Sequence, residues 1–176
     1  MIVELISEDE VKEIVEGLAK RIATDFVGRE LMLVGVLDGA FVFLTDLSRA
    51  LLRQGVENMT IDFIGIDTYG AGTESSGEPK ITKDLKRDVK DKTVLIVEDI
   101  LDTGLSLSVL QAMIKARQPK QIATVVLLSK RARRKIDVPV EYIGREIEDK
   151  FVVGYGLDYD GHHRELPYIG ELVLDK

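Results

Sequence analysis

The chain has 176 residues, of which 45% are hydrophobic and 31% charged, and its formal net charge is −7. This size and composition are typical of one globular domain with a full core, whereas the negative charge argues against a broad nucleic-acid-binding surface. The chain has no cysteine, which excludes disulfides and a cysteine nucleophile, and no apolar run approaches the roughly 18 residues of a membrane span.

The N-terminal residues turn acidic at once and lack the basic region that begins a signal peptide, so we expect a cytoplasmic protein. Ser7 and Glu10 have the spacing of a helix capping box. Apolar residues then recur at helical spacing from Val11 to Ile22. Together these features predict a helix over residues 8–26.

The next segments alternate between strand and helix patterns. Residues 31–37 and 59–67 have the length and apolar content of strands, and residues 41–52 between them predict a second helix. This succession predicts an α/β fold with a mainly parallel sheet. Residues 68–77 are rich in glycine and serine, which is ordinary for a surface loop, but their place beside the candidate site suggests a lid. Residues 81–85 are expected to return as a strand.

The most informative stretch begins with the apolar residues 94–97, which predict a strand buried on both faces. Glu98 and Asp99 follow, then Asp102 and a run of small and hydroxyl residues, and after them a helical pattern that ends before Pro119. Ligands bind outside the carboxyl ends of strands in open α/β sheets, so this is a candidate site.

The two halves of this stretch suit different ligand groups. Thr103, Gly104 and Ser106 would place hydroxyls and backbone N–H groups at a helix N-terminus, where an anion is favoured. Glu98 and Asp99 would accept hydrogen bonds from sugar hydroxyls or hold Mg²⁺. The simpler alternative, a helix cap, needs one such residue and leaves the paired acids unexplained.

Two further segments should border the same edge of the sheet. Asp38 and Gly39 follow the strand 31–37, as the acids follow the strand 94–97. Lys130 follows a predicted strand at 122–128 and opens a basic cluster. Such a cluster is ordinarily a solvated surface or a nucleic-acid-binding patch.

The stretch from Glu98 to Ser106 closely resembles the phosphoribosyl-pyrophosphate (PRPP) signature of type I phosphoribosyltransferases. Four other segments, at residues 38–39, 127–131, 146–159 and 166–170, narrow the resemblance to the hypoxanthine-guanine branch and extend it over nearly the whole chain. The resemblance implies a single domain over residues 1–176, with a central mainly parallel sheet, flanking helices and a small hood built from the chain termini. The lid would be the loop at about 68–77.

The resemblance also implies purine salvage by a Mg²⁺-dependent glycosyltransferase. This enzyme would move the 5-phosphoribosyl group of PRPP to N9 of hypoxanthine or guanine, giving IMP or GMP and pyrophosphate. It would use no nucleic acid or membrane partner and would form a homodimer or homotetramer. A non-proline cis peptide is typical of the loop at Asp38-Gly39, whose amides would hold pyrophosphate.

The resemblance assigns roles to individual residues. Asp102 would exchange a proton with purine N7. Phosphate and ribose binding falls to Glu98, Asp99, Asp102, Thr103, Gly104, Leu105 and Ser106, and pyrophosphate binding to Asp38, Gly39 and Arg164. Purine binding falls to Lys130, Phe151, Val152 and Asp158, the lid to Thr68 and Tyr69, and Mg²⁺ binding to Glu98, Asp99 and Asp158. Lys130 alone of its basic cluster receives a role, and the other basic residues are expected to be surface.

Several alternatives can be weighed on the sequence. Asp102-Thr103-Gly104 also resembles an aspartic protease motif, but that fold is all-β. The strand ending at Asp99 resembles a response-regulator receiver, but too little chain follows it. Gly154 and Gly156 lack the third glycine of a dinucleotide fingerprint. His162 and His163 could be metal ligands or ordinary surface residues. A regulator that senses PRPP stays open, although it would be expected to carry an added domain or a basic face.

Overall fold

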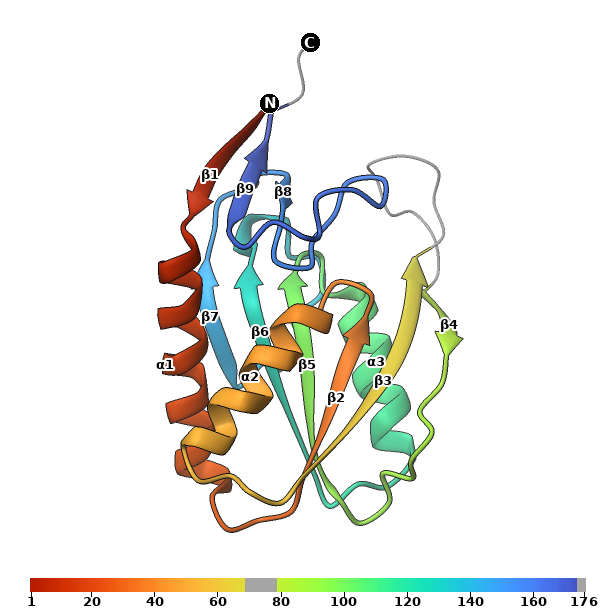
Figure 1. The fold of residues 1–176 in the computed structure, drawn as a ribbon. Helices are drawn as coiled ribbons and strands as arrows, with labels where there is room; N and C mark the ends of the chain where they lie inside the picture. The colour runs from red at the N-terminus through yellow and green to blue at the C-terminus, as the bar shows by residue number, and fades with distance from the viewer. Residues whose placement is uncertain (69–78, 174–176) are drawn as a thin grey trace.

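The computed structural model describes residues 1–68 and 79–173. Its main sheet comprises β2 (Leu31–Leu37), β3 (Met59–Thr68), β4 (Pro79–Lys83), β5 (Thr93–Leu101), β6 (Gln121–Ser129) and β7 (Tyr142–Glu146). The strands lie in the order β4-β3-β2-β5-β6-β7, and all neighbours are parallel except β3 and β4 (Figure 1). The predicted α/β fold with a mainly parallel sheet is therefore confirmed.

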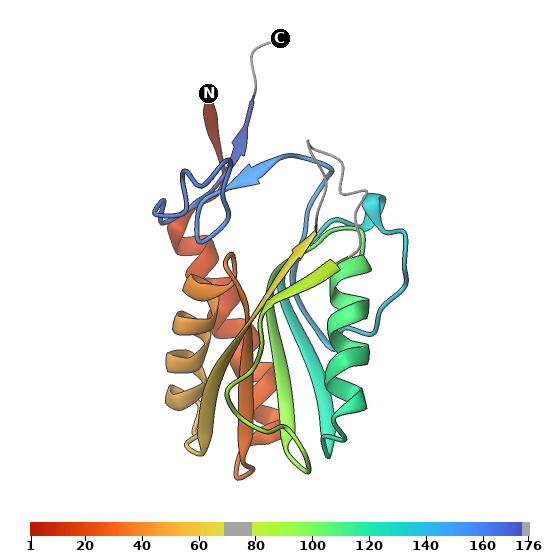
Figure 2. The same cartoon turned by 90° about the vertical axis from the view of Figure 1, so that its right-hand side faces the viewer.

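Helices cover both faces of this sheet. They are α1 (Glu8–Phe26), α2 (Phe41–Arg53) and α3 (Leu105–Ala116). Helices α1 and α2 lie on one face and α3 on the other (Figure 2). Side chains of β5 alternate between the two resulting cores: Leu95 and Val97 pack with α1 and α2, and Val94 and Ile96 pack with α3. All four are fully buried, as the apolar run at 94–97 predicts.

A second, smaller sheet is made by both ends of the chain. It comprises β1 (Ile2–Ile6), β8 (Val152–Val153) and β9 (Ile169–Leu172), in the antiparallel order β1-β9-β8. Figure 1 shows this sheet above the carboxyl ends of the parallel strands. It is the small hood that the family resemblance implies, and it encloses the edge where the candidate site lies.

Helix α1 begins where the capping box predicts. The Glu10 N–H donates to Ser7 Oγ at 3.3 Å, and the Ser7 N–H donates to Glu10 Oε2 at 2.9 Å. Glu10 also lies 3.1 Å from Arg145 on β7, so the cap ties the helix to the edge strand of the sheet. Among the described residues no helix is long and apolar enough to cross a membrane.

Two predicted strands differ from the sequence-based expectation by more than one residue at an end. Strand β4 spans Pro79–Lys83 instead of 81–85, because the chain turns away at Asp84. Strand β5 continues through the acids to Leu101, because its backbone still pairs with β6 at Glu98. Thr68 is the last residue of β3, and the rest of the predicted lid, including Tyr69, lies outside the described residues.

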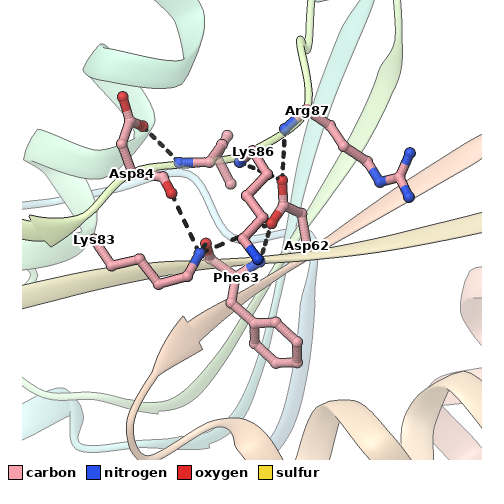
Figure 3. A network of polar contacts seen from close by, with 7 residues as sticks. Asp62, Phe63, Lys83, Asp84, Lys86 and Arg87 are labelled. Carbon is pink, nitrogen blue, oxygen red and sulfur yellow. Dashed lines mark hydrogen bonds and ion pairs between the residues drawn. The ribbon is translucent and has the colours of Figure 1, made fainter.

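A buried carboxylate joins β3 to the connection that leads from β4 to β5 (Figure 3). Asp62 is 5% exposed and accepts hydrogen bonds from the N–H groups of Phe63, Lys86 and Arg87, each at 2.8 Å. Lys83 Nζ lies 3.9 Å from the same carboxylate. Burial alone would raise the pKa of Asp62, but the three N–H donors and the nearby lysine outweigh it and lower the pKa below its ordinary value.

We predict that Asp62→Asn lowers the free energy of unfolding by about 1–3 kcal/mol at pH 7, because an amide replaces one accepting oxygen with a donor that faces backbone N–H groups. The contribution of the ionised carboxylate is fully present above the unfolded-state pKa of about 4. It is lost as pH falls through the lower pKa of the folded state, so the difference between variant and parent should shrink below about pH 4.

Urea unfolding at several pH values measures this difference. Glu57→Gln is the matched control, because it also removes one carboxylate but at an exposed position before β3. Equal effects of the two substitutions at pH 7 would contradict the stabilising role of Asp62.

Candidate active site

The candidate site is built where the parallel strands end beneath the hood. Glu98 and Asp99 occupy adjacent positions near the C-terminal end of β5. Asp99 is 8% exposed and accepts a hydrogen bond from the Ile100 N–H at 2.7 Å. The acids therefore come from the rigid end of a central strand and not from a loop.

Both carboxylates are costly to ionise in the free protein. Burial and the neighbouring charge of Asp99 raise the pKa of Glu98 well above its usual range. Burial also raises the pKa of Asp99, and hydrogen bonds to Glu98 and Ile100 offset this in part. Two crowded carboxylates would be stabilised by a cation, and their oxygens suit a hard cation such as Mg²⁺. The donor set at these two residues thus fits the predicted metal.

The third predicted metal ligand is engaged elsewhere. Among the described residues no group of three or more His, Cys, Asp or Glu side chains is placed to hold a metal ion in the free protein. Asp158 instead lies 3.0 Å from Arg164 and accepts from the Gly161 N–H at 2.7 Å. The histidines at 162–163 likewise belong to no metal-binding group in this part of the chain.

The loop after β2 lies directly against the acids of β5. The Leu37–Asp38 peptide bond is cis, as the family resemblance implies for this loop. A Cβ atom on Gly39 would overlap Asp99 Oδ2, so the loop backbone can approach the carboxylate only because residue 39 is glycine. The expectation that both loops open on the same edge is confirmed.

The part of the hood between β8 and β9 lies against this loop on the other side. A Cβ on Gly156 would overlap the carbonyl oxygen of Gly39, and Gly156 has a φ of +99°, a conformation that glycine adopts without strain. The Gly156 carbonyl accepts from Arg164 Nη1 at 2.7 Å. The Arg164 Nη2 atom lies 3.8 Å from Asp38, so Arg164 places a positive charge beside the loop predicted to bind pyrophosphate.

The N-cap residue of α3 has no side chain with which to cap the helix. Gly104 is the N-cap residue, with a φ of +87° and no side-chain cap hydrogen bond. Thr103 Oγ1 accepts from the Leu105 N–H at 3.3 Å, so the simpler cap interpretation accounts for Thr103 but not for Asp102. First-turn N–H groups without an internal partner form a ready anion site. This geometry suits the phosphate cradle predicted over residues 103–106.

Asp102 lies among the basic residues that follow β6. Arg133 Nε is 2.8 Å from Asp102 Oδ1, and Arg134 Nε donates to the Asp102 backbone carbonyl at 3.1 Å. Lys130 is only 6% exposed; burial lowers its pKa, and the charges of Asp102 and Asp149 oppose this shift. The expectation that every basic residue of this cluster except Lys130 is plain surface is therefore wrong for Arg133 and Arg134.

Little in the sequence indicates these two contacts. Arg133 and Asp102 lie on segments joined only through β6, and the run of basic residues resembles an ordinary solvated cluster. The one available signal is that the cluster directly follows a buried strand adjacent to β5. Strand ends that share one edge of a sheet bring such segments together.

A predicted purine-binding segment is linked to Asp102 through Asp149. Arg133 Nη1 lies 3.5 Å from Asp149, two residues before Phe151, so the 149–152 segment meets Asp102 through one arginine. Phe151 is 40% exposed and contacts Tyr159 edge-to-face at 5.5 Å, whereas Val152 is buried in β8. Phe151 is thus not a core residue, and its ring is accessible to a flat ligand.

Comparisons with known proteins agree with this geometry. A family model described as a phosphoribosyl transferase domain matches residues 5–160. The hypoxanthine-guanine phosphoribosyltransferase of Dictyostelium discoideum is 43% identical over 96% of this chain and 93% of its own length. The crystal structure of a hypoxanthine phosphoribosyltransferase from Staphylococcus aureus superposes with a TM-score of 0.89 at 40% identity, covering 97% of this chain and 90% of that one.

A longer relative shows the same similarity in part. The bifunctional protein TilS/HprT of Listeria monocytogenes is 45% identical over 96% of this chain, which spans only 25% of that protein's length. The fold and the match over residues 5–160 define a phosphoribosyltransferase. The chain belongs to this family and, within it, to the hypoxanthine-guanine branch.

We predict that Gly39→Ala destabilises the protein by about 1–3 kcal/mol, because the added methyl group overlaps the Asp99 carboxylate and the close-packed loop must shift. Gly17→Ala is the control, since a Cβ at this helical position meets nothing within 4 Å. Alanine there should stabilise the helix by about 0.5–1 kcal/mol. Chemical unfolding of both variants measures the contrast, and a neutral Gly39→Ala would contradict the tight contact.

Proposed function

We propose that the chain catalyses transfer of the 5-phosphoribosyl group from PRPP to N9 of hypoxanthine or guanine, releasing pyrophosphate and giving IMP or GMP. The observation that carries the proposal is the meeting of Asp102 with the Lys130 segment and, through Arg133, with the Asp149 segment. A sugar-phosphate signature and a purine-binding segment thus share one rim, as a transfer between a sugar and a base requires.

The phosphate groups of PRPP would occupy the two backbone cradles. The 5-phosphate would bind the N–H groups at Thr103–Ser106, where the helix N-terminus favours an anion. Pyrophosphate would bind the amides of Asp38 and Gly39, with Arg164 beside them. As the leaving group gains negative charge, these preorganised donors would stabilise it more than they stabilise the bound substrate.

The ribose would lie over Glu98 and Asp99. Their carboxylates would accept hydrogen bonds from the ribose hydroxyls and favour the positive charge that develops on the ring. Glu98 and Asp99 would hold Mg²⁺, which when bound would supply positive charge that offsets the charge of pyrophosphate. The same positive charge would favour ionisation of Glu98, whose pKa is raised by burial and by Asp99 in the free protein.

The purine would lie between Lys130 and Phe151, with its N7 facing Asp102. Asp102 would act as the general base or acid at N7, because the described residues donate no side-chain hydrogen bond to its Oδ2 atom. The Phe151 ring would stack on the purine, the Val152 main chain would contact its edge, and Lys130 would donate to the 6-oxo group. Closure of the 68–77 segment over the site would exclude water from the ribosyl cation.

We further propose a cytoplasmic homodimer or homotetramer. Three large apolar side chains, Phe41 and Leu52 on α2 and Ile61 on β3, are 41%, 56% and 42% exposed. Association with further copies of the chain would remove such apolar surface from water.

We predict that the enzyme is active with hypoxanthine and guanine and has little activity with adenine. An ammonium group only donates hydrogen bonds, so Lys130 would pair with a 6-oxo group and would face another donor in adenine. An unpaired donor in a closed pocket costs about 1–3 kcal/mol, which corresponds to roughly fivefold to more than a hundredfold in kcat/KM.

Pyrophosphate release from PRPP and Mg²⁺ with each purine in turn measures this selectivity. The same assay separates an enzyme from a PRPP-sensing regulator, which would bind PRPP without releasing pyrophosphate. Lys130→Met should narrow the difference between the bases, whereas a parent protein that prefers adenine would overturn the assignment of Lys130.

We predict that Asp102→Asn keeps PRPP binding but loses most of the turnover, on the order of 10²–10⁴-fold in kcat, because the amide cannot exchange the N7 proton. Steady-state kinetics together with calorimetric titration of PRPP separate the two effects. An unchanged kcat would remove Asp102 from the chemistry.

A further inference from the structure

Asp102 is held by partners on one side only. Its Oδ1 atom is buried, and the nearest donor, Arg133 Nε at 2.8 Å, forms an ion pair with it without hydrogen-bond geometry. The Asp102 side chain as a whole is 38% exposed, so its exposed surface belongs to atoms other than Oδ1. One carboxylate oxygen thus faces Arg133, while the described residues donate nothing to the other.

Arg133 is itself held in place from a third segment. Its Nη1 atom lies 3.5 Å from Asp149, and its side chain is 35% exposed. Arg133 closes the short 3₁₀ turn Arg131–Arg133, and the next residue, Arg134, donates to the Asp102 backbone and to Ser129 Oγ. The turn and the residue that follows it therefore contact both the side chain and the main chain of Asp102.

We propose that Arg133 is a positioning residue for the general base, an inference that rests on the proposed phosphoribosyl transfer. By pairing with Oδ1 and anchoring itself on Asp149, Arg133 fixes the orientation of the Asp102 carboxylate and leaves Oδ2 directed at purine N7. Without this partner the carboxylate would rotate toward the ammonium of Lys130, which is buried beside it. A displacement of about 1 Å at a reacting group is enough to cost on the order of 10²-fold in rate.

The test compares Arg133→Gln with two other substitutions in the full chain. Arg133→Gln should lower kcat by about 10–100-fold with little change in the KM for PRPP, because the phosphate cradles lie elsewhere. Arg133→Lys, which keeps a positive charge within reach of Asp102, should recover a large part of the loss. A substitution that merely loosened the fold would show no such recovery.

Arg131→Gln is the matched control. It removes the same charge from the same 3₁₀ turn, but Arg131 is 83% exposed and lies 3.8 Å from Glu146, away from Asp102. Its kcat and KM should equal those of the parent. If Arg131→Gln lowers kcat as much as Arg133→Gln does, then removing any positive charge from the turn causes the loss, and the proposal is wrong.

A double-mutant cycle decides whether Arg133 acts through Asp102. In an Asp102→Asn background Arg133→Gln should lower kcat by less than about twofold, since no carboxylate remains to be oriented. An equal loss in both backgrounds would mean that Arg133 acts on the substrates directly, and unchanged kinetics in the parent background would mean that it does not act at all. Either result overturns the proposal.

A failure of the positioning role is distinguishable from a failure of the proposed function. If the parent protein releases no pyrophosphate with PRPP, Mg²⁺ and any purine, then the proposed reaction is at fault. If the parent is active and only the Arg133 kinetics or the cycle disagree, then the reaction stands and the positioning role falls.

Discussion

The site depends on the close approach of the loop backbone at Gly39 to a side chain of the sheet and to the backbone of the hood. The loop after β2 contacts the Asp99 carboxylate of β5 on one side and Gly156, between β8 and β9 of the hood, on the other. Neither glycine has room for a Cβ atom, so the loop backbone lies directly against the Asp99 carboxylate and the hood backbone. A hydrogen bond from Tyr155 to Asp46, at 2.6 Å, holds the same hood segment on α2. The positions of the acids and of the loop amides are therefore fixed together.

This packing has an electrostatic consequence. It gathers Asp38, Asp99 and Asp158 around the guanidinium of Arg164, and it leaves Glu98 and Asp99 with raised pKa values. Such an arrangement is costly in a free protein and favourable once a cation and a developing ribosyl charge arrive. The crowded acids thus lower the stability of the free protein at the place where the proposed reaction would need negative charge. The apolar cores on both faces of the sheet compensate for this loss of stability.

Local patterns predicted most of the fold. The capping box at Ser7 placed the start of α1, and apolar runs at residues 31–37 and 94–97 marked the central strands, because each pattern is written in adjacent residues. The extension of β5 to Leu101 was missed, since it is decided by pairing with β6, a non-local contact. The pairing of the two termini in the hood was implied by the family and not by any local pattern.

The candidate site divides in the same way. Acids and glycines next to a strand end could be recognised in sequence, but the partners of Asp102 could not, because they follow a different strand. The structure shows that a single short segment, residues 130–134, provides a buried amine and two guanidinium groups, one beside the Asp102 carboxylate and one that donates to the Asp102 backbone carbonyl. In the proposed reaction the same segment would bind the purine and hold Asp102, the residue that exchanges a proton with it. Base selection and catalysis would then be coupled through the chain itself, so a change in the turn that altered one would be expected to disturb the other.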